Sequence, residues 1–263
     1  MDELITSPQN PKIKKLVALQ QKSSERRDCG LFVVEGQREL ERCIAAGYEV
    51  DTLFVCKDNF SSDSSFTKKA DRTIFLSREV YAKVAYREGT EGVIAEVRAR
   101  SLSLEDLALG DNPLVVVLES VEKPGNLGAV LRSADAAAAS AVLVCDPLTD
   151  LYNPNLIRAS LGGIFTVPCV ACGSSEAITY LKDNGIRILT AQLQDSSWYY
   201  DCPMTGPTAI VIGTEASGLT GQWREAADEH IRIPMLGALD SLNASVSAAI
   251  LMFEAVRQRM CRK

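Results

Sequence analysis

The feature that most constrains the fold of this chain is the apolar run LVVVLES at residues 114–120. A strand with one solvated face alternates apolar and polar residues, whereas this run has five consecutive aliphatic residues. We therefore expect it to lie in a parallel sheet that helices cover on both faces. Further short apolar runs alternate with helical patterns as far as the C-terminal helix, which favours a mainly parallel α/β domain.

The expected elements fall into two groups. In the first half we expect a helix beginning at Pro11, strands over 31–36, 52–56, 73–76 and 92–97, and helices over 40–47 and up to Ala85. In the second half we expect strands over 114–120, 141–145, 164–170, 186–191, 208–213 and 230–234, and helices over 126–139, 154–161, 174–184 and 243–260. A Gly-Asp-Asn-Pro break ends the connecting segment. The expected domains are 1–105 and 114–263, with a linker over 106–113.

Charge is distributed unevenly over a net −6. Residues 1–105 hold 17 basic and 17 acidic residues, which leaves 11 basic and 17 acidic residues for 106–263. The first half also concentrates cations near its start, where they could meet phosphates or simply form a solvated helix face. These cations are Lys12, Lys14, Lys15, Lys22, Arg26 and Arg27.

Several classes of protein are disfavoured. No apolar run reaches the ~20 residues of a membrane span, and the N-terminal segment lacks the apolar core of a secretory signal, so we expect a cytoplasmic protein without membrane contact. Eight cysteines are spread singly except for Cys169 and Cys172, and His230 is the one histidine. We therefore expect reduced cysteines and no metal site. The phosphate loop of P-loop enzymes, the dinucleotide fingerprint and the serine-hydrolase elbow are all absent from the sequence.

Three segments carry candidate chemistry. The first, EKPGNLGAVLRSADA (122–136), places Asn126 at a helix start and Arg132 further along; a capped helix with a solvated arginine would look the same. The second, VIGTEASGL (211–219), is a strand that opens into a glycine loop around Glu215, which a plain turn would also explain. The third, RIPMLGALDSLNASVSAA (232–249), leads to Ser241 and Asn243, which could be ordinary N-caps.

Together these segments resemble the SpoU/TrmH family of RNA ribose methyltransferases, part of the SPOUT superfamily. Asn-Leu-Gly with a following Arg and Ala-Asp-Ala, Gly-x-Glu-x-x-Gly, and Ile-Pro-Met with Ser-Leu-Asn occur in the family's order. Segments at 152–154 and 158–162 are similar to the family's intervening region. SPQNPKIKKL and FVVEGQRELERCI resemble the N-terminal substrate-binding domain of the rRNA-modifying branch, which folds like ribosomal protein L30e.

The resemblance implies a C-terminal α/β trefoil-knot catalytic domain with a mainly parallel sheet, preceded by a small L30e-like α/β domain. It implies S-adenosylmethionine as the cofactor, a homodimer, and an active site made of Asn126, Arg132, Glu215, Ser241 and Asn243. The cofactor would contact Thr190, Ala191, Gly213, Glu215, Gly218, Ile233, Met235, Ser241, Leu242 and Asn243. RNA would contact Lys12, Lys14, Lys15, Arg26, Arg27 and Arg38.

The implied reaction is methyl transfer to a ribose 2′-hydroxyl, which excludes DNA as a substrate. Because a guanidinium stays protonated, Arg132 is expected to stabilise the developing alkoxide rather than to act as a free base. Large-subunit rRNA is the favoured substrate. A tRNA methyltransferase, an inactive RNA-binding or assembly factor and an enzyme that protects rRNA from an antibiotic remain alternatives. Ala138 departs from the family, which often has glycine there.

Overall fold

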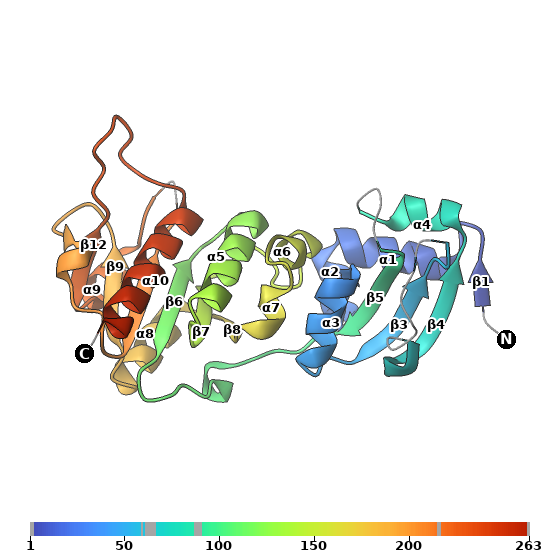
Figure 1. Ribbon diagram of the computed structural model, residues 1–263, viewed down its shortest axis with the longest axis horizontal. Coiled ribbons are helices and arrows are strands. Elements are labelled where there is room, and N and C mark those ends of the chain that lie inside the picture. The colour runs from blue at the N-terminus through green and yellow to red at the C-terminus, as the bar shows by residue number, and fades with distance from the viewer. Residues whose placement is uncertain (1–2, 59, 61–66, 87–90, 215–216, 262–263) are drawn as a thin grey trace. The chain divides into compact units, whose positions relative to one another are not determined.

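The computed structural model describes residues 3–58, 60, 67–86, 91–214 and 217–261 (Figure 1). The chain forms two compact units. The N-terminal unit consists of Met1–Arg100 together with Asp150–Phe165, and the C-terminal unit of Ser101–Thr149 together with Thr166–Lys263. The segment 150–165 thus belongs to the N-terminal unit although residues of the C-terminal unit flank it on both sides in the sequence.

The N-terminal unit is built on a mixed five-stranded sheet with the order β1-β4-β3-β5-β2. β4 pairs in parallel with β1 and β3, whereas β5 is antiparallel to both β3 and β2. The strands are β1 (Glu3–Ile5), β2 (Leu31–Glu35), β3 (Val50–Val55), β4 (Ala70–Leu76) and β5 (Val93–Arg98). The helical segments are α1 (Pro11–Gln21), α2 (Ser23–Cys29), α3 (Gln37–Ala45), η1 (Thr67–Lys69), α4 (Arg78–Val84) and α6 (Pro154–Ala159).

Helix α1 illustrates how local sequence produces this packing. The Asn10 side chain accepts a hydrogen bond from the Lys12 amide at 2.9 Å and caps the helix, and Pro11 occupies its first position, where no amide hydrogen is needed. Ile13, Leu16 and Leu19 share one helix face and are almost fully buried in the core of the unit. The helix expected from Pro11 is confirmed.

The C-terminal unit is built on a seven-stranded sheet with the order β10-β12-β9-β11-β6-β7-β8, in which every pair is parallel. The central strand β6 (Leu114–Glu119) is buried at every residue, as its unbroken apolar run predicts. The other strands are β7 (Ala141–Cys145), β8 (Cys169–Cys172), β9 (Arg187–Ala191), β10 (Ser197–Trp198), β11 (Thr208–Ile212) and β12 (Glu229–Arg232). The expected parallel α/β class is confirmed.

Helices cover this sheet on both faces. α5 (Pro124–Ala136) packs against α10 (Ala244–Met260), which also contacts β6 and β11 (Figure 1). α8 (Ser174–Asp183) and α9 (Gly221–Ala226) supply Ala177, Leu181 and Trp223 to the core of the unit. The remaining helical segments of this unit are η2 (Leu104–Asp106) and η3 (Tyr199–Asp201), whereas α7 (Gly163–Thr166) belongs to the N-terminal unit up to Phe165. No helix of the described residues is both long and apolar enough to cross a membrane.

The strand expected over 164–170 is wrong. Residues 163–166 form α7, and β8 covers 169–172. A short apolar run does not distinguish a strand from a buried helical turn, and here the Ser160 hydroxyl accepts a hydrogen bond from the Ile164 amide at the start of that turn. The strand expected over 230–234 ends at Arg232, because Pro234 has no amide hydrogen for the ladder. The short elements β1, α2, β10 and α9 were not predicted.

Candidate functional site

A cavity of about 340 Å³ lies in the C-terminal unit at the carboxyl ends of β9, β11 and β12. Parallel strands bring these ends to one edge of the sheet, where open α/β sheets bind ligands. Its wall combines residues 191–194, the described part of 212–219, and residues from 231–235 and 240–247. Among the expected cofactor contacts, those that line the cavity are Ala191, Gly213, Gly218, Ile233, Met235, Ser241 and Leu242.

The glycine loop after β11 folds tightly on itself. The Thr214 amide donates to the Gly218 carbonyl at 3.2 Å, and the Gly218 amide donates back to the Thr214 carbonyl at 3.1 Å. A Cβ atom on Gly213 would lie 2.3 Å from the Gly218 carbonyl carbon and oxygen, so no larger residue fits there without moving the backbone. Glu215, which the sequence analysis places in this loop, lies outside the described residues.

A buried carboxylate holds the far end of the same loop. Glu119, at the end of β6, is 1% exposed. One of its oxygens accepts the Thr220 amide hydrogen at 2.9 Å, and the other accepts the Thr220 hydroxyl hydrogen at 2.6 Å. The central strand is therefore tied to the residue that follows the cavity wall, across 101 positions of sequence. Sequence reasoning did not single out either residue.

The first and third motifs meet at an asparagine pair. Asn243 caps α10, because its side-chain oxygen accepts the Ser245 amide hydrogen at 3.0 Å. Its amide nitrogen also donates to the Asn126 side-chain oxygen at 3.2 Å. Asn243 is thus both an ordinary N-cap and a link to α5. Neither asparagine lines the cavity itself, but Asn243 directly follows Ser241 and Leu242, which do.

The remaining expected residues lie around this centre. Arg132 is exposed on α5, and within the described part of the chain its side chain has no hydrogen-bond or ion-pair partner. Ser241 is exposed and donates to the Asp240 carboxylate at 3.3 Å. Thr190 is fully buried behind the wall, where its hydroxyl and His230 Nδ1 are 2.6 Å apart.

Two further residues of the cavity wall were not predicted. Gln192 Oε1 and Arg232 Nε are buried atoms without a hydrogen-bond partner, and no other buried side-chain nitrogen or oxygen of the described residues is in that state. Buried polar atoms are nearly always paired, so an unpaired donor and an unpaired acceptor in one cavity point to a ligand that completes them. Arg232 begins the third segment and Gln192 lies outside all three, and the sequence singled out neither side chain.

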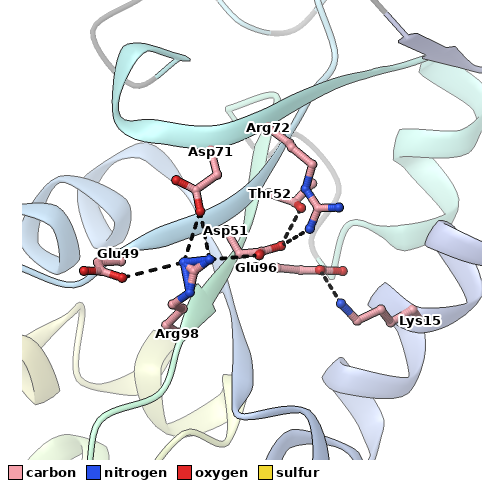
Figure 2. A network of polar contacts seen from close by, with 8 residues as sticks. All are labelled: Lys15, Glu49, Asp51, Thr52, Asp71, Arg72, Glu96 and Arg98. Atoms are coloured by element: carbon pink, nitrogen blue, oxygen red, sulfur yellow. Dashed lines mark hydrogen bonds and ion pairs between the residues drawn. The ribbon is translucent and has the colours of Figure 1, made fainter.

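The basic residues of the N-terminal unit differ in how they are presented. Lys14, Arg27 and Arg38 are exposed. Lys12 pairs with Glu3 at 2.5 Å, and Lys15 pairs at 3.1 Å with Glu96 (Figure 2).

Arg26 requires a correction. It is 5% exposed, and its guanidinium donates to the Asp150 carboxylate at 2.5 Å and to the Leu19 carbonyl at 2.6 Å. A guanidinium that is buried and already bonded to a carboxylate and a backbone carbonyl is not presented to a phosphate, so we remove Arg26 from the expected RNA contacts.

The cysteines are all free thiols. Cys145 and Cys172 come closest, with their sulfur atoms 3.9 Å apart on β7 and β8. Among the described residues, no group of three or more His, Cys, Asp or Glu side chains is placed to hold a metal ion.

Comparisons with known proteins agree along the whole chain. The model of the SpoU rRNA Methylase family matches residues 113–253, and the model of the MRM3-like substrate binding domain matches residues 10–95. A 23S rRNA (uridine(2479)-2′-O)-methyltransferase from Streptomyces viridochromogenes is 30% identical over 97% of this chain and 92% of its own length.

Solved structures show the same similarity. An RNA 2′-O ribose methyltransferase is 39% identical, with a TM-score of 0.85 over 98% of this chain and 99% of its own. The SpoU methyltransferase AviRb from Streptomyces viridochromogenes, in complex with the cofactor AdoMet, is 27% identical, with a TM-score of 0.89 over 97% of this chain and 100% of its own.

Proposed function

Because this chain belongs to the SpoU rRNA methylase family, we propose that it transfers a methyl group from S-adenosylmethionine to a ribose 2′-hydroxyl of large-subunit rRNA. The observation that carries the proposal is the cavity at the ends of β9, β11 and β12, whose wall contains the second and third motifs of the family. The first motif adjoins it through the hydrogen bond between Asn126 and Asn243.

The cavity suits S-adenosylmethionine. It offers apolar side chains such as Ile212, Ile231 and Ile233 for a flat ring, together with an unpaired buried donor and acceptor for its polar edge. We assign Gly213, Ile233 and Leu242 to cofactor contacts and Glu215 to organising the glycine loop. We also propose that the loops at 190–193, 213–218 and 232–243 form the trefoil knot of the family.

The bound cofactor supplies a methyl group on a positively charged sulfur, which is already a strong electrophile. The protein must therefore position the ribose and assist loss of its proton, while the new O–C bond forms as the S–C bond breaks. Arg132 is exposed and unpaired among the described residues, so its guanidinium is available to stabilise the 2′-alkoxide. Ser241 and Asn243 hold the nucleotide, and Asn126 fixes the position of Asn243.

The proposal that rRNA is the substrate is based on the N-terminal unit. The substrate-binding match at residues 10–95 and the whole-length match to an rRNA methyltransferase favour rRNA over tRNA. Exposed Lys14, Arg27 and Arg38 supply phosphate contacts in this proposal, while Lys12 and Lys15 would have to exchange a carboxylate for a phosphate. We propose that the protein acts on this substrate in the cytoplasm.

We propose a homodimer that forms through the exposed face of α10. Val246, Phe253 and Met260 are 46%, 47% and 80% exposed, and their spacing of seven residues puts them on one side of the helix. An apolar stripe of this length on a helix is typical of a self-association surface. Phe253→Glu should convert the dimer to a monomer in light scattering, whereas Phe253→Leu should leave it dimeric. A wild-type monomer at micromolar concentration would contradict the assignment.

The experiment that tests the function maps 2′-O-methylation across rRNA and tRNA in cells with and without the gene. Loss of one methylated rRNA ribose, restored by wild type but not by Arg132→Ala, would establish both the substrate and the role of Arg132. The matched control is Lys182→Ala, which removes an exposed cation on α8, away from the cavity wall. Loss of a tRNA methyl group instead would support the tRNA alternative.

If no methyl group disappears although the purified protein binds S-adenosylmethionine, the chain is an RNA-binding or assembly factor. A methyl group that appears only under antibiotic challenge would indicate a resistance enzyme.

A further inference from the structure

The two unpaired atoms of the cavity wall lie at neighbouring positions. Ala191 of β9 and Ile231 of β12 are register partners, and the Gln192 amide donates to the Ile231 carbonyl at 3.0 Å. Gln192 and Arg232 each follow one of these partners. Residues at matching positions of adjacent parallel strands point to the same face, so their side chains share one side of the cavity edge.

A hydrogen bond from its own nitrogen fixes the orientation of the Gln192 side-chain amide. Nε2 donates to the Gln194 carbonyl at 2.9 Å, which leaves Oε1 as a buried acceptor without a donor. A buried carbonyl in this state costs free energy that a ligand donor would recover.

The Arg232 guanidinium is held by an aromatic ring. Its central carbon lies 4.3 Å from the centre of the Trp198 ring, and Trp198 is the register partner of Arg232 on β10. The stacked guanidinium keeps Nε buried and without an acceptor. The edge of the cavity therefore presents one fixed acceptor beside one fixed donor.

We propose that Gln192 and Arg232 recognise the adenine edge of the cofactor, with Gln192 Oε1 accepting from the exocyclic amino group and Arg232 Nε donating to the neighbouring ring nitrogen. This inference rests on the proposed function. Among the groups of S-adenosylmethionine, the carboxylate only accepts, the ammonium only donates, the sulfonium does neither, and the ribose hydroxyls rotate and so fix neither role. Adenine carries a donor and an acceptor side by side in one rigid plane, and the isoleucines of the wall suit its faces.

The test measures binding by calorimetry with three probes. S-adenosylhomocysteine carries the whole recognition surface, S-inosylhomocysteine has a carbonyl oxygen in place of the adenine amino group, and methylthioadenosine keeps adenine but lacks the amino acid. Wild type should bind S-adenosylhomocysteine about 100-fold more tightly than S-inosylhomocysteine. The carbonyl oxygen of the inosyl probe cannot donate to Gln192 Oε1, so buried polar groups would remain unpaired.

Gln192→Leu should reduce the preference for S-adenosylhomocysteine over S-inosylhomocysteine by about tenfold. It should weaken the binding of S-adenosylhomocysteine and of methylthioadenosine by the same factor. Gln192→Glu keeps an acceptor but loses the hydrogen bond to the Gln194 carbonyl, so it should restore only part of the preference. Arg232→Met keeps an apolar stem on Trp198 but no Nε, and should weaken both adenine probes by about tenfold. Gln222→Leu, an exposed glutamine on α9 that pairs with Ser175, is the matched control.

Two results would overturn the inference: an unchanged preference in Gln192→Leu with a native thermal unfolding curve, or a loss confined to S-adenosylhomocysteine, which would place the pair at the amino-acid end. Wild type that binds none of the probes would instead overturn the proposed function.

Discussion

Two single residues of the C-terminal unit stand out, one for its backbone conformation and the other for its burial. Ala138 adopts a left-handed backbone with φ of 51° at the turn after α5. The buried Glu119 carboxyl group accepts hydrogen bonds from Thr220, which precedes α9. Each feature follows from one side chain in one backbone position, so each can be tested by a single substitution.

Ala138→Gly should stabilise the protein by about 0.5–1 kcal/mol. A left-handed conformation costs an L-residue about 1–2 kcal/mol, which exceeds the added flexibility of glycine in the unfolded chain. The measurement is thermal or denaturant unfolding. Ala136→Gly, at the last residue of α5, is the control and should destabilise; stabilisation by both variants would contradict a conformational cause.

Glu119→Gln and Thr220→Val should each weaken cofactor binding, because either change removes a hydrogen bond that holds the end of the glycine loop. Each loss should be about 1–3 kcal/mol. The double variant should lose little more than either single one, since the two residues act as a pair. Thr220→Ser keeps the hydroxyl and should bind as wild type does. Strictly additive losses would show that the two residues act separately.

At the scale of elements, neighbouring strands of the N-terminal sheet carry a charged network in addition to their apolar cross-strand pairs. Arg98 of β5 contacts Glu49, Asp51 and Asp71, and Asp51 also accepts from Arg72 (Figure 2). Glu96, two residues before Arg98 on β5, is 3% exposed and pairs with Lys15 of α1. The network links helix and sheet through groups whose charge depends on pH.

Burial raises the pKa of the Glu96 carboxyl above its ordinary 4.5, although the hydrogen bond and charge of Lys15 oppose this. The folded state therefore holds this proton more tightly than the unfolded chain does. The free energy of unfolding should fall as the pH rises from 4.5 through the raised folded-state pKa.

The Glu96→Gln side chain cannot titrate, so this variant should not show the fall in the free energy of unfolding. The measurement is urea unfolding across pH 4 to 8.

Asp51 provides the opposite case. Burial raises its pKa, but hydrogen bonds from Thr52 and Arg72 outweigh burial and lower it below 3.8. Asp51→Asn should therefore lose stability above pH 3.8 and still show the fall due to Glu96. An unchanged pH profile in Glu96→Gln would contradict the assignment.

At the scale of the whole molecule, one segment belongs to a different unit from its sequence neighbours. Tyr152 lies within the span of the SpoU family match but completes the aromatic core of the N-terminal unit, stacked 4.2 Å from Phe32. Its hydroxyl donates to the Arg100 carbonyl at 2.5 Å and accepts the Arg100 amide hydrogen at 3.1 Å. The Arg26–Asp150 ion pair fixes the same segment.

Tyr152→Ala should destabilise the N-terminal unit by about 2–4 kcal/mol through lost ring packing, and Tyr152→Phe by about 1–2 kcal/mol through lost hydrogen bonds. Hydrogen exchange followed by mass spectrometry should show faster exchange in β2 and β5 than in wild type. β9 and β11 of the C-terminal unit serve as the internal control. Faster exchange confined to β9 and β11 would contradict the assignment of Tyr152 to the N-terminal unit.

Local pattern alone determined much of this protein. The unbroken aliphatic run of β6 predicted the parallel sheet, because only burial on both faces explains it. The three motifs predicted the family and most of the cavity wall, because glycine, proline and asparagine at the ends of elements determine the backbone conformation within a few residues. The pattern was ambiguous at 163–172, where a helical turn and a strand have the same composition.

Only the tertiary structure decided which distant residues meet. Glu119 and Thr220, Asn126 and Asn243, and the unpaired atoms of Gln192 and Arg232 come together because parallel strands end at one edge. Arg26 became a buried structural residue because Asp150 reaches it from another part of the chain. Such pairings depend on strand order and burial, which are long-range properties, whereas a sequence pattern records only the preferences of neighbouring residues.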